Sequence, residues 1–145
     1  MNKKGKIAKE ILEIFPAFIK KINQGMTKTG EIPSAQMSAI MILADKNQCT
    51  LGRLSKDMGV TAPTATGIVD RLYKSGYVKR IRSQEDRRIV NITLTAKGKK
   101  AKKNIHKMAT QRWRVISNIL SLKDQEMHIR ILKKIVKGLD EYYEK

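Results

Sequence analysis

Residues 50–94 of this 145-residue chain read TLGRLSKDMGVTAPTATGIVDRLYKSGYVKRIRSQEDRRIVNITL. Thr50 is a suitable N-cap for a short helix whose apolar residues recur at helical spacing, namely Leu51, Leu54 and Met58. Gly59 follows, and glycine ends a helix in a left-handed turn at little steric cost. The stretch is therefore predicted to begin with one helix and a tight turn.

A second helix is predicted directly after this turn. Thr61 is a suitable N-cap, Pro63 occupies the first turn, where a missing N–H does no harm, and Gly76 marks the end. The predicted buried stripe consists of Ala65, Ile68, Val69 and Leu72.

A basic hairpin is predicted next. Val78 and Ile81 indicate one strand, and Val90, Ile92 and Leu94 alternate as the residues of a second strand should. Between the strands lie six polar residues, Ser83, Gln84, Glu85, Asp86, Arg87 and Arg88. Helix, turn, helix and hairpin in this order predict a winged helix-turn-helix. In this fold the second helix enters the major groove of DNA and the hairpin, or wing, reaches the flanking minor groove.

Helices are predicted on both sides of this motif. The apolar spacing indicates helices over residues 5–24, from Ser34 as N-cap to about residue 46, over 95–120 and over 121–143. The expected fold is mainly α with a small β-hairpin wing (α+β), in one domain over 1–145. Residues 34–94 would form the winged helix-turn-helix part. The end helices carry more apolar residues than such a motif needs, so they either fold back onto it or, as we favour, pair with a second copy.

The composition favours a polyanionic partner. Lys and Arg number 31 against 13 Asp and Glu, giving a net charge of +18 and a pI near 10.2. Double-stranded DNA is the first candidate and an acidic membrane surface the second. No apolar run approaches the roughly 20 residues of a membrane span, and the N-terminus lacks the features of a signal peptide. With Cys49 as the only cysteine, we expect a cytoplasmic protein with no intramolecular disulfide.

Three segments resemble the MarR family of transcriptional regulators. TLGRLSKDMGV (50–60) resembles the supporting helix and turn, VTAPTATGIVDRLYKSGYVKR (60–80) the recognition helix, and EDRRIVNITLTAKGKK (85–100) the wing and the Leu-Thr-x-x-Gly start of the next helix. The resemblance implies a homodimer built from helices 5–24 and 95–143, bound to a near-palindromic operator. It also implies a small-molecule pocket between the dimerisation and DNA-binding parts.

The resemblance also implies roles for individual residues. Arg88 matches the wing-tip arginine that enters the minor groove, and Asp86 matches the carboxylate that orients it. Many members carry an arginine where this chain has Gly67, so readout here would depend on threonine contacts, on Arg71 at the DNA backbone and on groove shape. The residues expected to bind DNA are Thr61, Pro63, Thr64, Thr66, Arg71, Arg82, Arg87 and Arg88.

A ligand pocket is the least direct expectation. Apolar side chains that could enclose a small apolar or aromatic ligand where the terminal helices meet the motif are Phe15, Phe18, Met41, Met108 and Val115. Ordinary packed core is the competing interpretation of these residues.

Other classes of function receive no support from the sequence. It contains no nucleophile motif, phosphate-binding glycine loop or paired metal-ligand spacing, so we expect no enzyme, no cofactor and no metal site; His106 and His128 lie far apart, and Cys49 is expected to be structural. The leading interpretation is a sequence-specific regulator, a repressor released by a small-molecule ligand. The alternative is a loosely specific or architectural binder of double-stranded DNA, which the net charge of +18 and Gly67 both favour.

Overall fold

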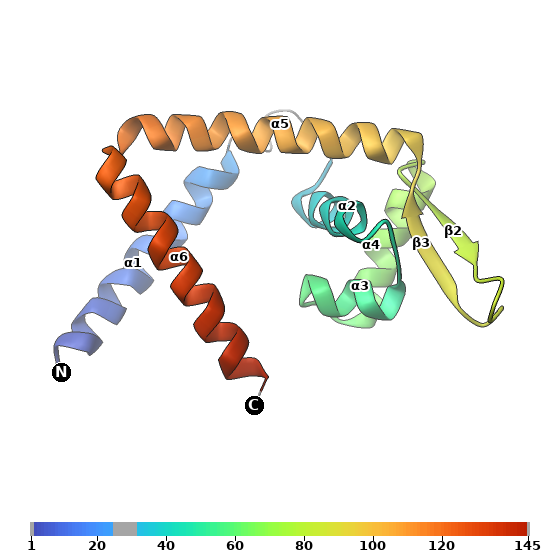
Figure 1. The fold of residues 1–145 in the computed structure, drawn as a ribbon, viewed down its shortest axis with the longest axis horizontal. Helices are drawn as coiled ribbons and strands as arrows, with labels where there is room; N and C mark the ends of the chain where they lie inside the picture. The colour runs from blue at the N-terminus through green and yellow to red at the C-terminus, as the bar shows by residue number, and fades with distance from the viewer. Residues whose placement is uncertain (1, 25–31, 145) are drawn as a thin grey trace. The chain divides into compact units, whose positions relative to one another are not determined.

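A computed structural model describes residues 2–24 and 32–144 of the chain. The chain divides into two compact units, Met1–Met108 and Ala109–Lys145. Helix dominates both units, and the one sheet of the described residues lies in the first (Figure 1). The fold class is therefore as predicted, mainly α with a small β wing.

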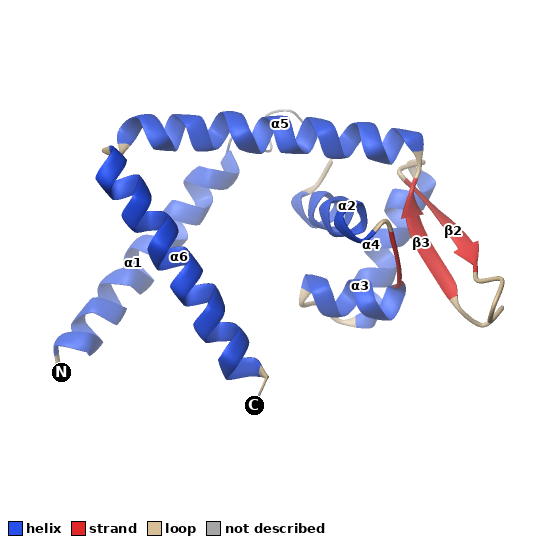
Figure 2. Cartoon of the chain, viewed as in Figure 1, coloured by secondary structure: helices blue, strands red, loops and turns tan. Residues whose placement is uncertain are grey.

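The first unit contains the winged helix-turn-helix. Its elements after residue 32 are α2 (Ser34–Lys46), β1 (Gln48–Thr50), α3 (Leu51–Met58), α4 (Ala62–Lys74), β2 (Val78–Arg82) and β3 (Val90–Leu94). Figure 2 shows the strands β2 and β3 extending from the helices as a hairpin. The helix that follows, α5 (Ala96–Ile119), begins in this unit.

The sheet has three antiparallel strands in the order β1-β3-β2. In its register Ile92 lies opposite Cys49 on one side and Arg80 on the other. The strand β1 was not predicted from the sequence. A strand of three residues has too few positions to show an alternating pattern, and pairing with β3 defines it.

Most local signals for helix ends are confirmed. The side chains of Thr50 and Thr61 accept hydrogen bonds from the N–H groups of Arg53 and Thr64, and Gly59 adopts the left-handed conformation with φ 65°. The prediction of Ser34 as an N-cap is wrong. Pro33 is the N-cap of α2, and its carbonyl closes the first turn by accepting from two backbone N–H groups, so no side-chain cap is needed.

The core of the unit lies between α2, α3, α4 and the sheet. The predicted stripe of α4 is buried in full, and the largest completely buried side chains of the unit are Ile40, Leu43, Leu54, Leu72, Ile92 and Val69. Two strand residues that were expected to alternate inward, Ile81 and Val90, are exposed. Both lie at the distal end of the hairpin, beyond the helices that cover the rest of the sheet.

The start of α5 is packed tightly against the wing. Thr95 caps the helix by accepting from the N–H of Gly98, and its own hydroxyl lies 2.6 Å from the carbonyl oxygen of Gly76. A Cβ atom at Gly98 would lie 2.1 Å from the carbonyl oxygen of Tyr77. Only glycine allows this approach, which explains physically the Thr-x-x-Gly pattern at the helix start.

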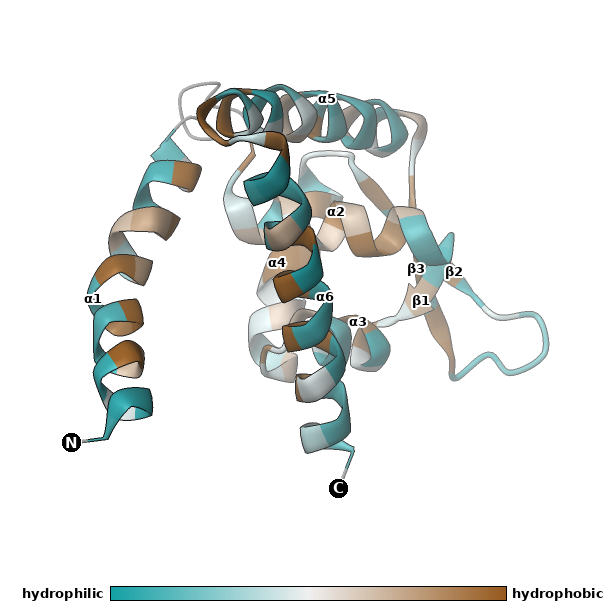
Figure 3. Ribbon diagram, turned by 60° about the vertical axis from the view of Figure 1, so that its left-hand side comes forward, coloured by the Kyte–Doolittle hydropathy of each residue, from teal (hydrophilic) through white to brown (hydrophobic). Residues whose placement is uncertain are grey.

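The terminal helices, α1 (Lys3–Gln24) and α6 (Leu122–Tyr143), leave large apolar side chains exposed. Helix α6 has no buried residue at all, and Figure 3 shows hydrophobic segments recurring along both helices. The exposed large apolar residues of α1 are Ile7, Ile11, Leu12, Ile14, Phe15, Phe18 and Ile19; those of α6 include Met127, Ile131, Leu132, Ile135, Leu139 and Tyr142. Each helix therefore leaves these side chains exposed within its own unit.

Candidate nucleic-acid interface

The N-terminal end of α4 exposes a cluster of hydroxyl groups. Thr61, Pro63 and Thr64 are all exposed, and the Thr61 and Thr64 hydroxyl oxygens lie 2.9 Å apart. Thr66 is half-buried, and its hydroxyl donates to the carbonyl of Ala62 at 2.9 Å. Because that hydrogen is already used, Thr66 offers a DNA base a lone pair and a methyl group rather than a donor.

Arg71 lies next to Gly67 on α4. A Cβ atom at Gly67 would meet only the Nη2 atom of Arg71, at 3.7 Å, so steric crowding does not require the glycine. Arg71 itself is exposed. Its guanidinium group therefore lies over the helix surface that a side chain at residue 67 would otherwise occupy.

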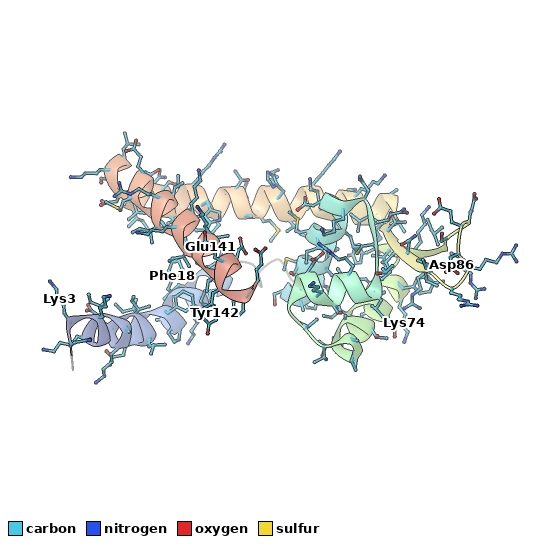
Figure 4. The ribbon with its side chains drawn as sticks, turned by 60° about the horizontal axis from the view of Figure 1, so that its bottom comes forward. Lys3, Phe18, Lys74, Asp86, Glu141 and Tyr142 are labelled. Carbon is cyan, nitrogen blue, oxygen red and sulfur yellow. The ribbon has the colours of Figure 1, made fainter. Side chains whose placement is uncertain are left out.

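The tip of the wing is held by hydrogen bonds within the loop. The Ser83 hydroxyl accepts from the N–H groups of Glu85 and Asp86, and the Asp86 carboxylate accepts from the N–H of Arg88 at 2.9 Å. Figure 4 shows Asp86 near the far end of the hairpin. Arg87 and Arg88 are exposed, and the loop conformation determines the direction in which both side chains leave the backbone.

The structure thus brings Asp86 and Arg88 together, but through the backbone. The described residues contain no ion pair between the two side chains. The Asp86 side chain forms an Asx-type turn, which is a common role for aspartate in loops.

Arg80 is a residue whose role the sequence analysis missed. Its guanidinium group forms a salt bridge with Asp70 of α4 and lies 5.4 Å from the centre of the Tyr73 ring. Asp70 and Tyr73 are three residues apart and therefore share one helix face. Arg80 ties β2 of the wing to the recognition helix. The isolated acid at residue 70 was the available signal, but sequence spacing does not reveal its partner.

The charge of this region suits a polyanion. Between Thr61 and Leu94 the sequence has seven basic residues and three acidic ones, and of the acids Asp70 is paired with Arg80 while Asp86 is engaged with backbone. Lys79 and Arg82 are exposed on β2, and Arg87 and Arg88 are exposed at the wing tip. The eight residues expected to bind DNA all lie on α4 or the wing, and seven of them are exposed.

Cys49 has the environment of a structural cysteine. Its side chain is buried in β1, and burial raises the pKa of the thiol, with Asp57 adding to the shift while Lys46 and Arg53 oppose it. A raised thiol pKa disfavours the reactive thiolate.

Asp57 connects two helices of the motif. Its carboxylate lies 3.4 Å from the Lys46 amine of α2 and 3.1 Å from the Arg53 Nε atom of α3. Desolvation acts to raise the pKa of Asp57, but the Arg53 hydrogen bond and the charges of Arg53 and Lys46 together lower it.

The residues expected to line a ligand pocket come from both units of the chain. Phe15 and Phe18 are neighbours on α1, with ring centres 6.2 Å apart, and both are exposed. Met41 packs against the core of the first unit, whereas Val115 is exposed in the second. A shared pocket for Phe15, Phe18, Met41, Met108 and Val115 stays a prediction.

Residues 2–24 and 32–144 contain no cluster of His, Cys, Asp and Glu that could hold a metal ion. No helix among them is both long and apolar enough to cross a membrane.

Known proteins resemble the chain in both sequence and fold. The HTH-type transcriptional regulator SarZ of Staphylococcus saprophyticus is 34% identical over 105 residues, covering 72% of this chain and 66% of SarZ. YfiV of Bacillus subtilis, an HTH-type transcriptional regulator, is 42% identical over 65 residues, covering 45% of this chain and 41% of YfiV. The chain thus spans less than half the length of YfiV.

A solved structure and a family model agree with these relatives. A MarR family protein from Bacillus stearothermophilus has the same fold, with a TM-score of 0.78, 24% identity and coverage of 97% of this chain and 99% of that one. The sequence model of the MarR family matches residues 32–90, which include the whole helix-turn-helix and most of the wing. Residues 32–90 of this chain therefore belong to the MarR family of winged helix-turn-helix transcriptional regulators, and the chain as a whole has the fold of a MarR family protein.

Proposed function

We propose that this protein is a homodimeric repressor that binds a near-palindromic operator and is released from it by a small-molecule ligand. The observation that carries the proposal is the joint placement of the exposed threonines at the start of α4 and the arginines at the wing tip. The first set suits base edges in the major groove and the second suits the adjacent minor groove. Two copies would present this pair of contacts to two half-sites.

Ligand control is supported by analogy alone. The solved structures with this fold include NadR in complex with 4-hydroxyphenylacetate and a Bordetella bronchiseptica protein, BpsR, whose DNA binding is regulated by 6-hydroxynicotinic acid. Their identities to this chain are 24% and 19%. A ligand would act on this chain by binding more tightly to a dimer whose two recognition helices do not fit the operator.

The experiment is a binding titration with the DNA upstream of the protein's own gene, with and without excess random-sequence DNA. A repressor retains its operator in the presence of the competitor. The same titration over a range of salt should give a log–log slope of about −0.9 for each phosphate contact. A flat line would mean that the basic surface does not face DNA.

A second function is favoured by two features of the sequence, Gly67 and the net charge. Gly67 removes a base-reading side chain from α4, and the chain carries a net charge of +18, so binding could be dominated by phosphates. Under this alternative, a loosely specific or architectural binder, random DNA would compete as well as the upstream DNA does.

A further inference from the structure

We propose that a hollow between α2, β3 and the start of α5 binds a compact amphipathic carboxylate, meaning one acid group on an aromatic or short acyl body. The hollow has a volume of about 360 Å³ and lies wholly within the first unit. It is lined by Leu43, Ala44, Asn47, Thr93, Leu94, Lys99, Lys102 and Lys103. None of these residues belongs to the ligand pocket expected from the sequence.

The charge around the hollow is unbalanced. Lys99, Lys102 and Lys103 stand three and four residues apart, so they lie together on one face of α5. Helix α5 has eight Lys and Arg residues and no acid. Among the described residues, no carboxylate forms an ion pair with any of the three amines. Like charges at this spacing destabilise a helix, and a bound anion would relieve their repulsion.

Lys97, in the same helix, is a lysine whose amine has interaction partners. Its amine donates to the carbonyl of Ser75 at 2.7 Å and lies 4.6 Å from the centre of the Tyr77 ring. The three lysines at the hollow have no such contact among the described residues. Lys102 is nevertheless half-buried and lines the hollow, so part of its side chain is withdrawn from solvent.

The base of the hollow is apolar and preformed. Leu43 and Leu94 are core residues and Ala44 is half-buried beside them. The Thr93 hydroxyl donates to the carbonyl of Asn47 at 2.8 Å, which fixes the turn after α2 against β3. Asn47 is also the one non-glycine residue of the described chain with a positive φ, 61°. A cationic rim over an apolar base fits a ligand that has one acid group and a compact apolar body.

The position of the hollow relative to the wing argues against a DNA phosphate as its occupant. Leu94 pairs with Val78, the first residue of β2, so the hollow lies at the base of the wing. Arg87 and Arg88 lie beyond the opposite ends of the strands, at the tip. The ligand would contact both β3 and α5, so its binding would affect the connection between the wing and the helix that follows it. Any effect on DNA binding rests on the proposed function; binding of the carboxylate itself does not.

The test uses the full-length protein without DNA, titrated with 2-naphthoate and followed by backbone amide chemical shifts. We expect saturable shifts at Ala44, Asn47 and Thr93. Acetate supplies the charge without the body, and 2-naphthalenemethanol supplies the body without the charge, so both should bind more weakly. Inorganic phosphate binding as tightly as 2-naphthoate would overturn the proposed ligand class, and shifts confined to other residues would overturn the site.

Matched lysine variants make the test specific. Lys102→Met and Lys99→Met keep a long unbranched side chain and remove the positive charge. Each should weaken 2-naphthoate binding by about three- to tenfold, the effect of one partly solvated charge-assisted contact. Lys100→Met removes an exposed charge from the same helix outside the hollow and should leave binding unchanged. Equal binding by all three variants would contradict the proposal. So would a loss of DNA affinity in Lys102→Met with a salt slope smaller by about one, because that result identifies a phosphate contact.

Discussion

The carboxylate of Asp86 accepts a hydrogen bond from the backbone N–H of Arg88 at 2.9 Å, across one intervening residue of the wing loop. An acid at a DNA-binding tip is unfavourable by simple electrostatics, because it repels phosphate. The hydrogen bond gives this acid a different role, since it holds the backbone from which the Arg88 side chain extends. The Ser83 hydroxyl supports the same loop from its other end by accepting from the N–H of Asp86.

Asp86→Ala should therefore weaken DNA binding even though it removes a negative charge. Without the turn, the loop must be ordered when DNA binds, and that ordering has an entropic cost. Arg88→Ala should weaken binding by roughly 1–3 kcal/mol through loss of a minor-groove contact. The double variant should be little worse than Arg88→Ala alone, because the turn then has no arginine to place. Titrations by fluorescence anisotropy, after a check of folded stability, measure all three.

Asp86→Asn is the matched control, because asparagine keeps the acceptor oxygen and loses the charge. If the turn is what matters, Asp86→Asn should bind DNA at least as tightly as the unmodified protein. Tighter binding by Asp86→Ala, at unchanged stability, would show that the acid is only repulsive and would reject its orienting role.

Gly98→Ala should destabilise the fold. The added methyl group would meet the Tyr77 carbonyl oxygen at 2.1 Å, so α5 or the wing must move. Overpacking of this kind costs about 1–3 kcal/mol of unfolding free energy. Gly52→Ala is the control, because a Cβ atom there has no atom within 4 Å and alanine has the higher helix propensity. Denaturant unfolding should show a large loss for Gly98→Ala only; equal values would contradict the steric argument.

Sequence reasoning succeeded wherever the cause lies within a few residues. The caps at Thr50 and Thr61 and the buried stripe of α4 depend on neighbours at most one or two turns away. It failed where partners are distant in the chain. The strand β1 exists because it pairs with β3, some forty residues later, and Arg80 finds Asp70 only once the hairpin folds back on α4. The hollow at α5 also joins segments that no local pattern connects.

The protein should be a dimer at micromolar concentration, with twice the chain mass of 16.5 kDa in sedimentation velocity. The reason is the exposed apolar surface of α1 and α6, which a second copy would remove from water. Leu132→Glu places a charge in that surface and should shift the equilibrium toward monomer, whereas Lys133→Glu, at a neighbouring exposed position without apolar character, should not. A monomer in the unmodified protein would also remove the argument for paired half-sites.

Asp57 should make stability depend on pH at the acid end. Its pKa in the folded protein is lowered below the ordinary value of 3.8, so its stabilising contribution is fully present above that value. The contribution is lost as the pH falls below 3.8 through the folded-state pKa. The difference in unfolding free energy between the unmodified protein and Asp57→Asn should therefore be constant near neutral pH and shrink in acid. A difference that grows as the pH falls would have the wrong sign for this ion pair.

Arg80 should contribute to DNA binding more by ordering the wing than by supplying positive charge. Arg80→Gln and Lys79→Gln each remove one positive charge from β2, but only Arg80 contacts α4 through Asp70 and Tyr73. Both partners of the salt bridge are well exposed, with side-chain exposures of 41% and 46%, so global stability should change by less than about 1 kcal/mol in either variant. Arg80 is already partly neutralised by Asp70, so long-range electrostatics alone predicts the larger loss of DNA affinity for Lys79→Gln. If Arg80 holds the wing against the recognition helix, the order is reversed, and the backbone amides of residues 83–89 become more mobile in NMR relaxation only in Arg80→Gln. Asp70→Asn should reproduce that mobility. A larger affinity loss for Lys79→Gln, with unchanged relaxation in Arg80→Gln, would reduce the salt bridge to a surface contact without a role in DNA binding.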